Sequence, residues 1–292
     1  MTLTALTSFV QDVKVPPHVR RWVGVAAVLA FAFGCFIAIG ALPEDMPASD
    51  LGVLVWVAVL GVPLTVLLNT LEMRTTANAT GNSMTFASAF KITVLGSAAN
   101  MLPLPGGTMV RIAALTRAGA GLGKSAGITV LVGLLWLGIA GLVSAWGLAY
   151  FSVGAGIAMG VLALLATAIV LVTMFQQTKH TGAVFKLAAI KFALITTDLW
   201  RLSLCFAGFG IAVSPQQVSI FAIAGALGAA VSIVPAGFGV REGMSALLAP
   251  IAKLGAASGF LAPAVNRLIG MPVLLAAALL VVALERGSKA PS

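Results

Sequence analysis

The feature that most constrains this chain is a series of apolar runs, each about twenty residues long. A run of that length crosses the ~30 Å hydrocarbon core of a bilayer as a single helix. Of the 292 residues, 60% are hydrophobic and 9% are charged, and the mean hydropathy is +1.09. Water-soluble chains of this size do not normally have such a composition. The sequence therefore predicts an all-α, polytopic membrane protein.

Six runs are long enough to cross the bilayer. They are Trp22 to Leu42, Leu51 to Thr70, Ser125 to Tyr150, Ala155 to Phe175, Leu187 to Val213 and Ala262 to Leu284. The first run exceeds the apolar core of a cleaved signal peptide, so we interpret it as a retained span. These spans predict one transmembrane domain over residues 22–286, with short segments 1–21 and 287–292 outside it.

The charges of the connecting segments predict which side of the membrane they occupy. The chain has 17 basic and 8 acidic residues, and a basic excess in a membrane protein marks cytoplasmic loops rather than a nucleic-acid partner. Bases precede the first span and follow the last, whereas the loop after the first span carries Glu44, Asp45 and Asp50 and no base. Both termini are therefore predicted to be cytoplasmic, in a bacterial inner membrane.

Two further apolar segments are interrupted by proline and glycine, which break the hydrogen-bond ladder of a helix. One covers about 85–119 and breaks at 103–107, and the other covers about 217–257 and breaks at 235–239. Each is predicted to be a re-entrant helical hairpin. The residues LGSA precede the first break and LGAA the second, and an arginine follows each. Because three crossings separate the segments, an inverted repeat is predicted; chance similarity between short Ala/Gly-rich runs is the alternative.

The helix that follows each break is predicted to bind an anion at its first turn. Its first amides are expected to be unpaired, at the positive end of the helix dipole. Glycines let a phosphate approach, and an arginine adds a forked pair of donors, so a lipid phosphate suits the site. The predicted head-group residues are Gly106, Gly107, Thr108 and Arg111 in the first segment and Gly237, Gly239, Arg241 and Glu242 in the second. As an alternative, Arg241 and Glu242 neutralise each other at the hairpin tip.

Charged residues within the predicted spans indicate a path through the membrane. Asp198 and Arg201 stand three residues apart, on one helix face near mid-depth, where charges are costly. They are predicted to line or gate the path, with a self-contained ion pair as the alternative. Asn100 is placed on the same path. Arg267 is predicted either to anchor the last span or to line the cavity opposite the second hairpin.

Other residues are assigned structural roles. Lys191 is predicted to be a snorkelling anchor, and Glu72 to be solvated at the interface. Gly156 and Gly160 form a small-residue face that is predicted to close a helix pair within the chain, with a contact between two protomers of a homodimer as the alternative. No metal or cofactor is predicted: residues 118–125 end like a nucleotide-binding P-loop but lack its first glycine.

Three blocks of the sequence carry a family resemblance. They are Asn100 to Leu115, which includes Arg111, Val234 to Gly243 and Pro263 to Leu268. They resemble the membrane region of the lysylphosphatidylglycerol synthetase family, and the likeness extends from the first span to about Arg286. In that family the membrane region is implicated in flipping aminoacylated phosphatidylglycerol, while stand-alone relatives accompany glycolipid, lipid-linked sugar or hopanoid pathways.

The chain is expected to be similar to the stand-alone relatives, because these 292 residues contain no segment that resembles an aminoacyl-transferase domain. It departs from the family in the first block, where Pro105 to Gly107 replaces an Arg-Gly-Glu-like triplet. The resemblance implies a lipid translocase that moves an anionic phospholipid or a lipid-linked group between leaflets. The alternatives are a non-transporting scaffold for lipid or envelope enzymes, and an intramembrane lipid-dependent transferase. A transferase needs an acidic or basic side chain positioned beside a metal or a phosphate. The chain has only 8 acidic residues, mostly in loops, so the transferase is less favoured than the scaffold.

Overall fold

A computed structural model shows an all-helical chain and describes residues 17–42, 50–100, 106–178, 180–230 and 239–287. These residues contain no strand. The helices are α2 (Pro17–Gly40), α3 (Leu51–Trp56), the π-helix η1 (Val57–Gly61), α4 (Val62–Ala79), α5 (Phe86–Ala99), α6 (Gly106–Arg117), α7 (Leu122–Phe151), α8 (Val153–Gln177), α9 (Thr181–Gly208), α10 (Pro215–Ser219), α11 (Ala222–Ala230), α12 (Val240–Leu248) and α13 (Ala256–Gly287). The predicted all-α fold is confirmed.

Within the described residues, four helical stretches are long and apolar enough to cross a membrane. They are Gly52–Ala79, Leu122–Phe151, Val153–Gln177 and Ala256–Ala283, and they match four of the six predicted spans. The other two predicted spans coincide with α2 and α9. Charged side chains near the middle of α9 lower its apolar character. The polytopic helical architecture is therefore confirmed, and the number of six crossings stays a prediction.

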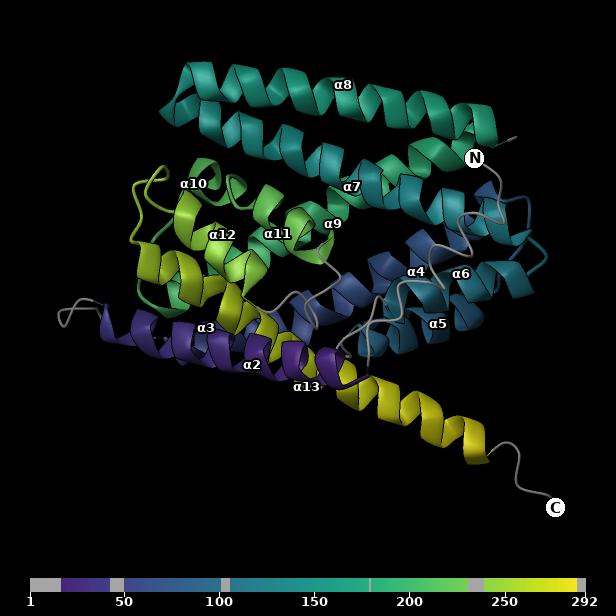
Figure 1. The fold of residues 1–292 in the computed structure, drawn as a ribbon, viewed down its shortest axis with the longest axis horizontal. Coiled ribbons are helices and arrows are strands. Elements are labelled where there is room, and N and C mark those ends of the chain that lie inside the picture. The colour runs from purple at the N-terminus through teal and green to yellow at the C-terminus, as the bar shows by residue number, and fades with distance from the viewer. Residues whose placement is uncertain (1–16, 43–49, 101–105, 179, 231–238, 288–292) are drawn as a thin grey trace.

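Each predicted break separates two helices that pack against each other. The first helix pair is α5 and α6, and the second helix pair is α11 and α12 (Figure 1). Pro103 and Pro235, with Gly237, lie outside the described residues. The division of both segments into two helices agrees with the prediction, and their re-entrance into the membrane stays a prediction.

Local sequence signals set where several helices begin. The side chain of Thr85 accepts the Ser88 amide at the start of α5, at 3.3 Å. Ser214 and Gln217 form a reciprocal capping box at the start of α10. Gly239, which precedes α12, has a left-handed φ of +81°, a conformation that glycine adopts without steric cost. Polar caps and glycine thus mark helix starts that the apolar runs alone do not define.

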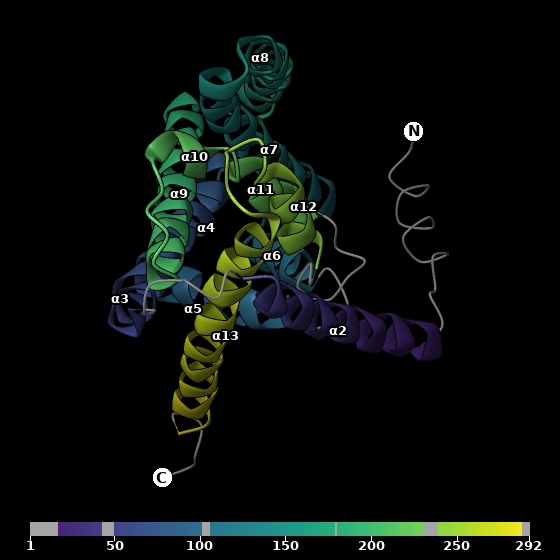
Figure 2. The ribbon, with the colours of Figure 1, turned by 90° about the vertical axis from the view of Figure 1, so that its left-hand side faces the viewer.

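The long helices α7 and α8 lie side by side and antiparallel, joined at Ser152 (Figure 1). A Cβ atom on Gly156 of α8 would lie 2.4 Å from the Cα of Ala149 in α7, so a glycine is needed at this contact. The prediction that this small-residue face packs within one chain is confirmed. Helices α2 and α13 also pack together, and α2 and the C-terminal end of α13 extend away from the other helices (Figure 2).

The centre of the fold is the contact between α4 and α9. Each helix pair packs against a long helix from the other half of the chain. Helix α5 of the first pair contacts α13, and α11 of the second pair contacts α7. Buried apolar side chains form two clusters that each include part of α9, one with Leu135 and Leu187 and the other with Phe206 and Phe221. This packing holds the polar residues of both helix pairs close to α9.

Candidate functional site

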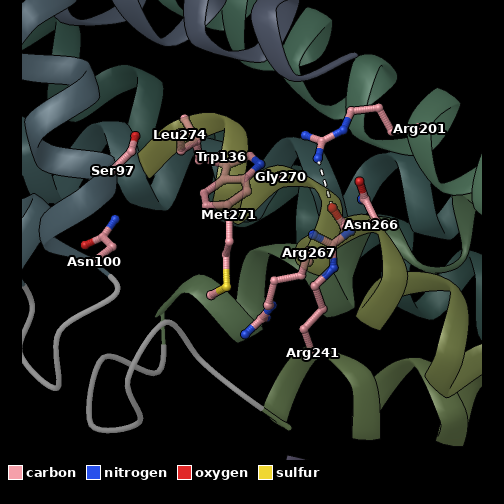
Figure 3. Close-up of a pocket in the computed structure, with 11 residues that line it drawn as sticks. Ser97, Asn100, Trp136, Arg201, Arg241, Asn266, Arg267, Gly270, Met271 and Leu274 are labelled. Atoms are coloured by element: carbon pink, nitrogen blue, oxygen red, sulfur yellow. Dashed lines mark hydrogen bonds between the residues drawn. The ribbon is translucent and has the colours of Figure 1, made fainter. Parts of the chain in front are cut away.

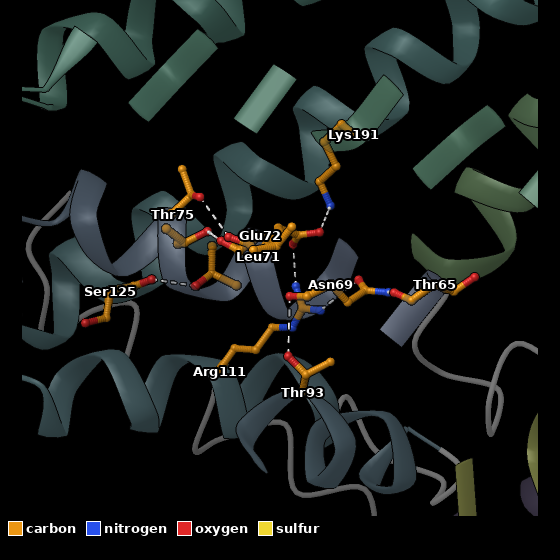
Figure 4. Close-up of polar contacts among 11 residues, drawn as sticks. Thr65, Asn69, Leu71, Glu72, Thr75, Thr93, Arg111, Ser125 and Lys191 are labelled. Carbon is orange, nitrogen blue, oxygen red and sulfur yellow. Dashed lines mark hydrogen bonds and ion pairs between the residues drawn. The ribbon is translucent and has the colours of Figure 1, made fainter. Parts of the chain in front are cut away.

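The first group of buried polar residues is centred on Glu72 of α4. Its carboxylate is fully buried and accepts from Arg111 Nη1 of α6 at 2.6 Å and from Lys191 Nζ of α9 at 2.8 Å (Figure 4). Arg111 also donates to Asn69 Oδ1 at 3.4 Å. The Lys191 ammonium lies 5.3 Å from the ring centroid of Trp136. We call Glu72, Arg111, Lys191 and Asn69 the Glu72 cluster.

The Glu72 cluster corrects two predictions. Glu72 is not solvated and Lys191 is not a snorkelling anchor, because both side chains are buried and paired. Helix α4 continues to Ala79, well past the end of the predicted apolar run at Thr70, so Glu72 lies inside a packed helix rather than at its end. The Arg111 guanidinium is held by this carboxylate, and Arg111 does not line the cavity described next.

A cavity of about 240 Å³ lies between the two helix pairs, and we call it the central cavity (Figure 3). Its described lining comes from α5, α7, α9, α11, α12 and α13, with Asn100 directly after α5. The lining residues are Ser97, Asn100, Trp136, Arg201, Gly225, Arg241, Asn266, Arg267, Gly270, Met271 and Leu274. The lining therefore combines three guanidinium groups with amide, hydroxyl and apolar side chains.

Two carboxylates beside the cavity pair with two of its arginines. Arg241 Nη2 lies 2.7 Å from Asp198 Oδ2, and Arg267 Nε lies 3.1 Å from Glu242 Oε1. Asn266 Nδ2 donates to Asp198 Oδ1 at 3.3 Å. The alternative that Arg241 and Glu242 neutralise each other is thus wrong, because adjacent residues of a helix point in different directions. Of the two predictions for Arg267, the structure agrees with the one that places it at the cavity.

The third arginine, Arg201, has a different environment. Its Nη1 donates to Thr65 Oγ1 at 3.2 Å and its Nη2 to the carbonyl of Asn266 at 3.3 Å. Its side chain approaches Gly61 of η1 and Gly270 of α13 so closely that a Cβ atom on Gly61 would lie 2.6 Å from Arg201 Cγ. The self-contained pair of Asp198 with Arg201 is not formed, because Asp198 pairs with Arg241 instead.

The π-helix η1 brings Gly61 to Arg201. The Val62 amide donates to the carbonyl of Val57, one residue further back than in an α-helix. Pro63 follows directly, and its missing amide removes a regular helical hydrogen bond at this place. Such π-turns within helices occur frequently at functional sites.

The backbone amides of Gly107 and Gly239, near the helix starts after the two breaks, are hydrogen-bonded, whereas the sequence predicted that they are unpaired. The Gly107 amide donates to Asn100 Oδ1 at 2.8 Å, and the Gly239 amide donates to Glu242 Oε2 at 2.9 Å. The prediction of bare amides at these two glycines is therefore wrong, because nearby side chains occupy them. Thr108 is exposed on α6. Gly106 begins that helix.

Residues 21–278 match the family described as the lysylphosphatidylglycerol synthase TM region. The chain belongs to this family. No curated protein matches it significantly. The matched residues include the whole Glu72 cluster and the whole lining of the central cavity. The family and the long apolar helices together identify a multi-pass membrane protein.

In this member of the lysylphosphatidylglycerol synthase TM family, the three blocks that carried the resemblance meet at one place. Asn100 of the first block, Arg241 of the second and Arg267 of the third all line the central cavity. Arg111, which also belongs to the first block, lies in the Glu72 cluster instead. The blocks are far apart in the sequence, so the fold brings them together.

Sequence reasoning missed Trp136 and Asn266 as lining residues. Trp136 sits in a continuous apolar run and carries no signal of its own. Asn266 precedes Arg267 within an apolar helix, and this pair of polar neighbours is a signal that could have located it. Among the described residues, no three His, Cys, Asp or Glu side chains lie close enough together to hold a metal ion.

Proposed function

We propose that this protein is a translocase that moves an anionic phospholipid, or an anionic lipid-linked group, between the leaflets of the bacterial inner membrane. The observation that carries the proposal is the central cavity between the two helix pairs. Its described lining holds Arg201, Arg241 and Arg267 and no carboxylate. Guanidinium groups match the oxygens of a phosphate, and charges inside a membrane usually face a polar path.

The size and the mixed lining of the central cavity suit a lipid head group. At about 240 Å³ the cavity lies below the ~300 to 1,000 Å³ that sites for whole small ligands occupy. This volume has room for a phosphate with a small polar substituent, while the acyl chains of the lipid remain in the bilayer. Met271 and Leu274 give the lining an apolar side along which the glycerol backbone of the lipid fits.

An inverted repeat supplies the route between leaflets in this proposal. The two halves, α4 to α7 and α9 to α13, have matching features that support it. In each half the arginine after the break pairs with a carboxylate on the preceding long helix, Arg111 with Glu72 and Arg241 with Asp198. Each helix pair also packs against the last long helix of the other half. Repeats of opposite orientation allow a site to face each side of the membrane in turn. In this proposal both termini lie on the cytoplasmic side.

A leaflet-exchange assay tests the proposal. Purified protein is reconstituted into vesicles that contain a tail-labelled anionic phospholipid, and the label accessible from outside is followed over time. The wild type is expected to accelerate exchange over protein-free vesicles. Arg241→Gln is expected to slow it at least ~tenfold, because it removes a charged hydrogen-bond partner of the phosphate.

Arg117→Gln is the matched control, since Arg117 lies exposed on α6 and away from the central cavity. It is expected to exchange lipid at the wild-type rate. A scaffold for other enzymes gives exchange at the protein-free rate with every variant, and that result would remove the translocase proposal.

A further inference from the structure

The charges around the central cavity do not balance. Three guanidinium groups line it, and two carboxylates, Asp198 and Glu242, pair with Arg241 and Arg267. Within the part of the chain that the structure describes, Arg201 has no carboxylate within ion-pair distance, and it donates to two neutral oxygens, Thr65 Oγ1 and the carbonyl of Asn266. One positive charge at the cavity is therefore left without a counter-charge.

The Glu72 cluster does not supply that counter-charge. Its carboxylate is fully buried and both of its oxygens already accept from Arg111 and Lys191. The Lys191 ammonium lies 5.3 Å from the ring centroid of Trp136, and Trp136, not Lys191, lines the cavity. The spare charge of Arg201 is thus a property of the central cavity itself.

The surroundings of Arg201 are built to keep this guanidinium in place. Its side chain is 9% exposed, and its Nε atom has no hydrogen-bond partner. The Oδ1 atom of Asn266, whose residue is 1% exposed, is also unpartnered. Gly61 and Gly270 leave the space that the guanidinium occupies, and any side chain at Gly61 would collide with it. A buried charge without a counter-charge is costly. A site that keeps such a guanidinium in place therefore points to a ligand of opposite charge.

We infer that the head group carried by this protein bears one net negative charge, as a phosphodiester does, and that Arg201 is its counter-charge in the central cavity. This inference rests on the proposed function and specifies its substrate class. A phosphodiester monoanion neutralises the single spare charge. A zwitterionic head group leaves the site charged, and a phosphomonoester or pyrophosphate brings a negative charge in excess.

Asp198 sets the number of charges that the cavity accepts. It neutralises Arg241, and Gly225 on α11 leaves room for this pair, with its Cβ position 3.4 Å from Asp198 Oδ2. Asp198→Asn keeps the size of the side chain and an oxygen acceptor but adds one net positive charge to the cavity. The variant is therefore expected to favour a head group with two negative charges.

The test compares three tail-labelled lipids in the vesicle assay at pH 8. They carry a glycerol phosphodiester, a phosphocholine and a phosphomonoester, whose net charges are about −1, 0 and close to −2. The wild type is expected to move the phosphodiester at least ~tenfold faster than either of the others, since one unbalanced charge at this depth exceeds the ~1.4 kcal/mol of a factor of ten. Arg201→Gln is expected to lose this preference, and Arg201→Lys, which keeps the charge, to retain it.

Asp198→Asn gives a readout that misfolding cannot imitate, because it is expected to shift the preference to the phosphomonoester. Three results would each overturn the inference without affecting the proposed translocase function. The wild type moves all three lipids equally, the Arg201→Gln variant still prefers the phosphodiester, or the Asp198→Asn variant has an unchanged preference. A wild type that moves none of the three lipids overturns the proposed function itself.

Discussion

Replacing Glu72 by Gln should destabilise the fold more than any other single polar substitution in α4. The carboxylate is fully buried, and the change leaves two cations, Arg111 and Lys191, facing each other across a neutral amide. Breaking a buried ion pair by removing one partner costs about 3 to 5 kcal/mol, because the remaining charge is left uncompensated.

The two cations do not contribute equally to this cost. The Lys191 side chain is 6% exposed, whereas that of Arg111 is 27% exposed and is partly screened by its surroundings. Most of the penalty therefore comes from Lys191, and we expect a loss of about 3 kcal/mol in the free energy of unfolding. A second substitution, Lys191→Met, removes that charge and keeps a side chain able to contact the Trp136 ring. The double variant should recover at least half of the loss.

Unfolding of the purified protein in mixed micelles, followed by circular dichroism as the denaturing detergent is increased, measures these free energies. Glu72→Gln, Lys191→Met and the double variant form a double-mutant cycle whose coupling energy isolates the pair. The reasoning is refuted when Glu72→Gln lies within about 0.5 kcal/mol of the wild type, the range of ordinary surface changes. A double variant no more stable than Glu72→Gln alone would refute it equally.

Two further substitutions test local features by the same unfolding measurement. Ser144→Ala removes a hydroxyl that donates to the Ser219 and Ile220 carbonyls and accepts from the Ile223 amide, between α10 and α11. The change should lower the free energy of unfolding by about 1 to 3 kcal/mol. An unchanged stability would show that these backbone groups find other partners. Gly239→Ala places a Cβ atom at a φ of +81° and should cost about 1 to 2 kcal/mol, although the space around it is open; a variant as stable as the wild type would contradict this.

The helices could be predicted because length and apolar character decide them within a membrane. All six predicted runs coincide with long helices, and both Pro/Gly interruptions separate packed helix pairs. Helix α4 extends past its apolar run to Ala79, and there the hydroxyl groups of Thr75 and Thr76 are satisfied by donating to carbonyls four residues back in the same helix. Polar residues that satisfy themselves locally do not end a helix, so hydropathy alone placed its end too early.

The partners of the charged residues could not be predicted from the sequence. Arg241 and Glu242 are neighbours in the chain, yet one pairs with Asp198 on α9 and the other with Arg267 on α13. Likewise, the carboxylate that holds Arg111 lies 39 residues away. Spacing along one helix identifies residues on a common face, but ion pairs between helices depend on which helices pack together, and that is set by the tertiary fold.

Helix α9 links the two polar regions, because it carries a residue of each. Lys191 belongs to the Glu72 cluster, and Asp198 and Arg201 stand at the central cavity two and three turns further on. Lys191 and Asp198 are seven residues apart and so share one face of the helix. The Glu72 cluster ties this face to α4 and α6 through two ion pairs that share one carboxylate, and at the cavity end the Arg201 guanidinium has no ion-pair partner among the described residues. We therefore expect a movement of α9 relative to α4 that reshapes the central cavity to strain the contact of Lys191 with Glu72 as well.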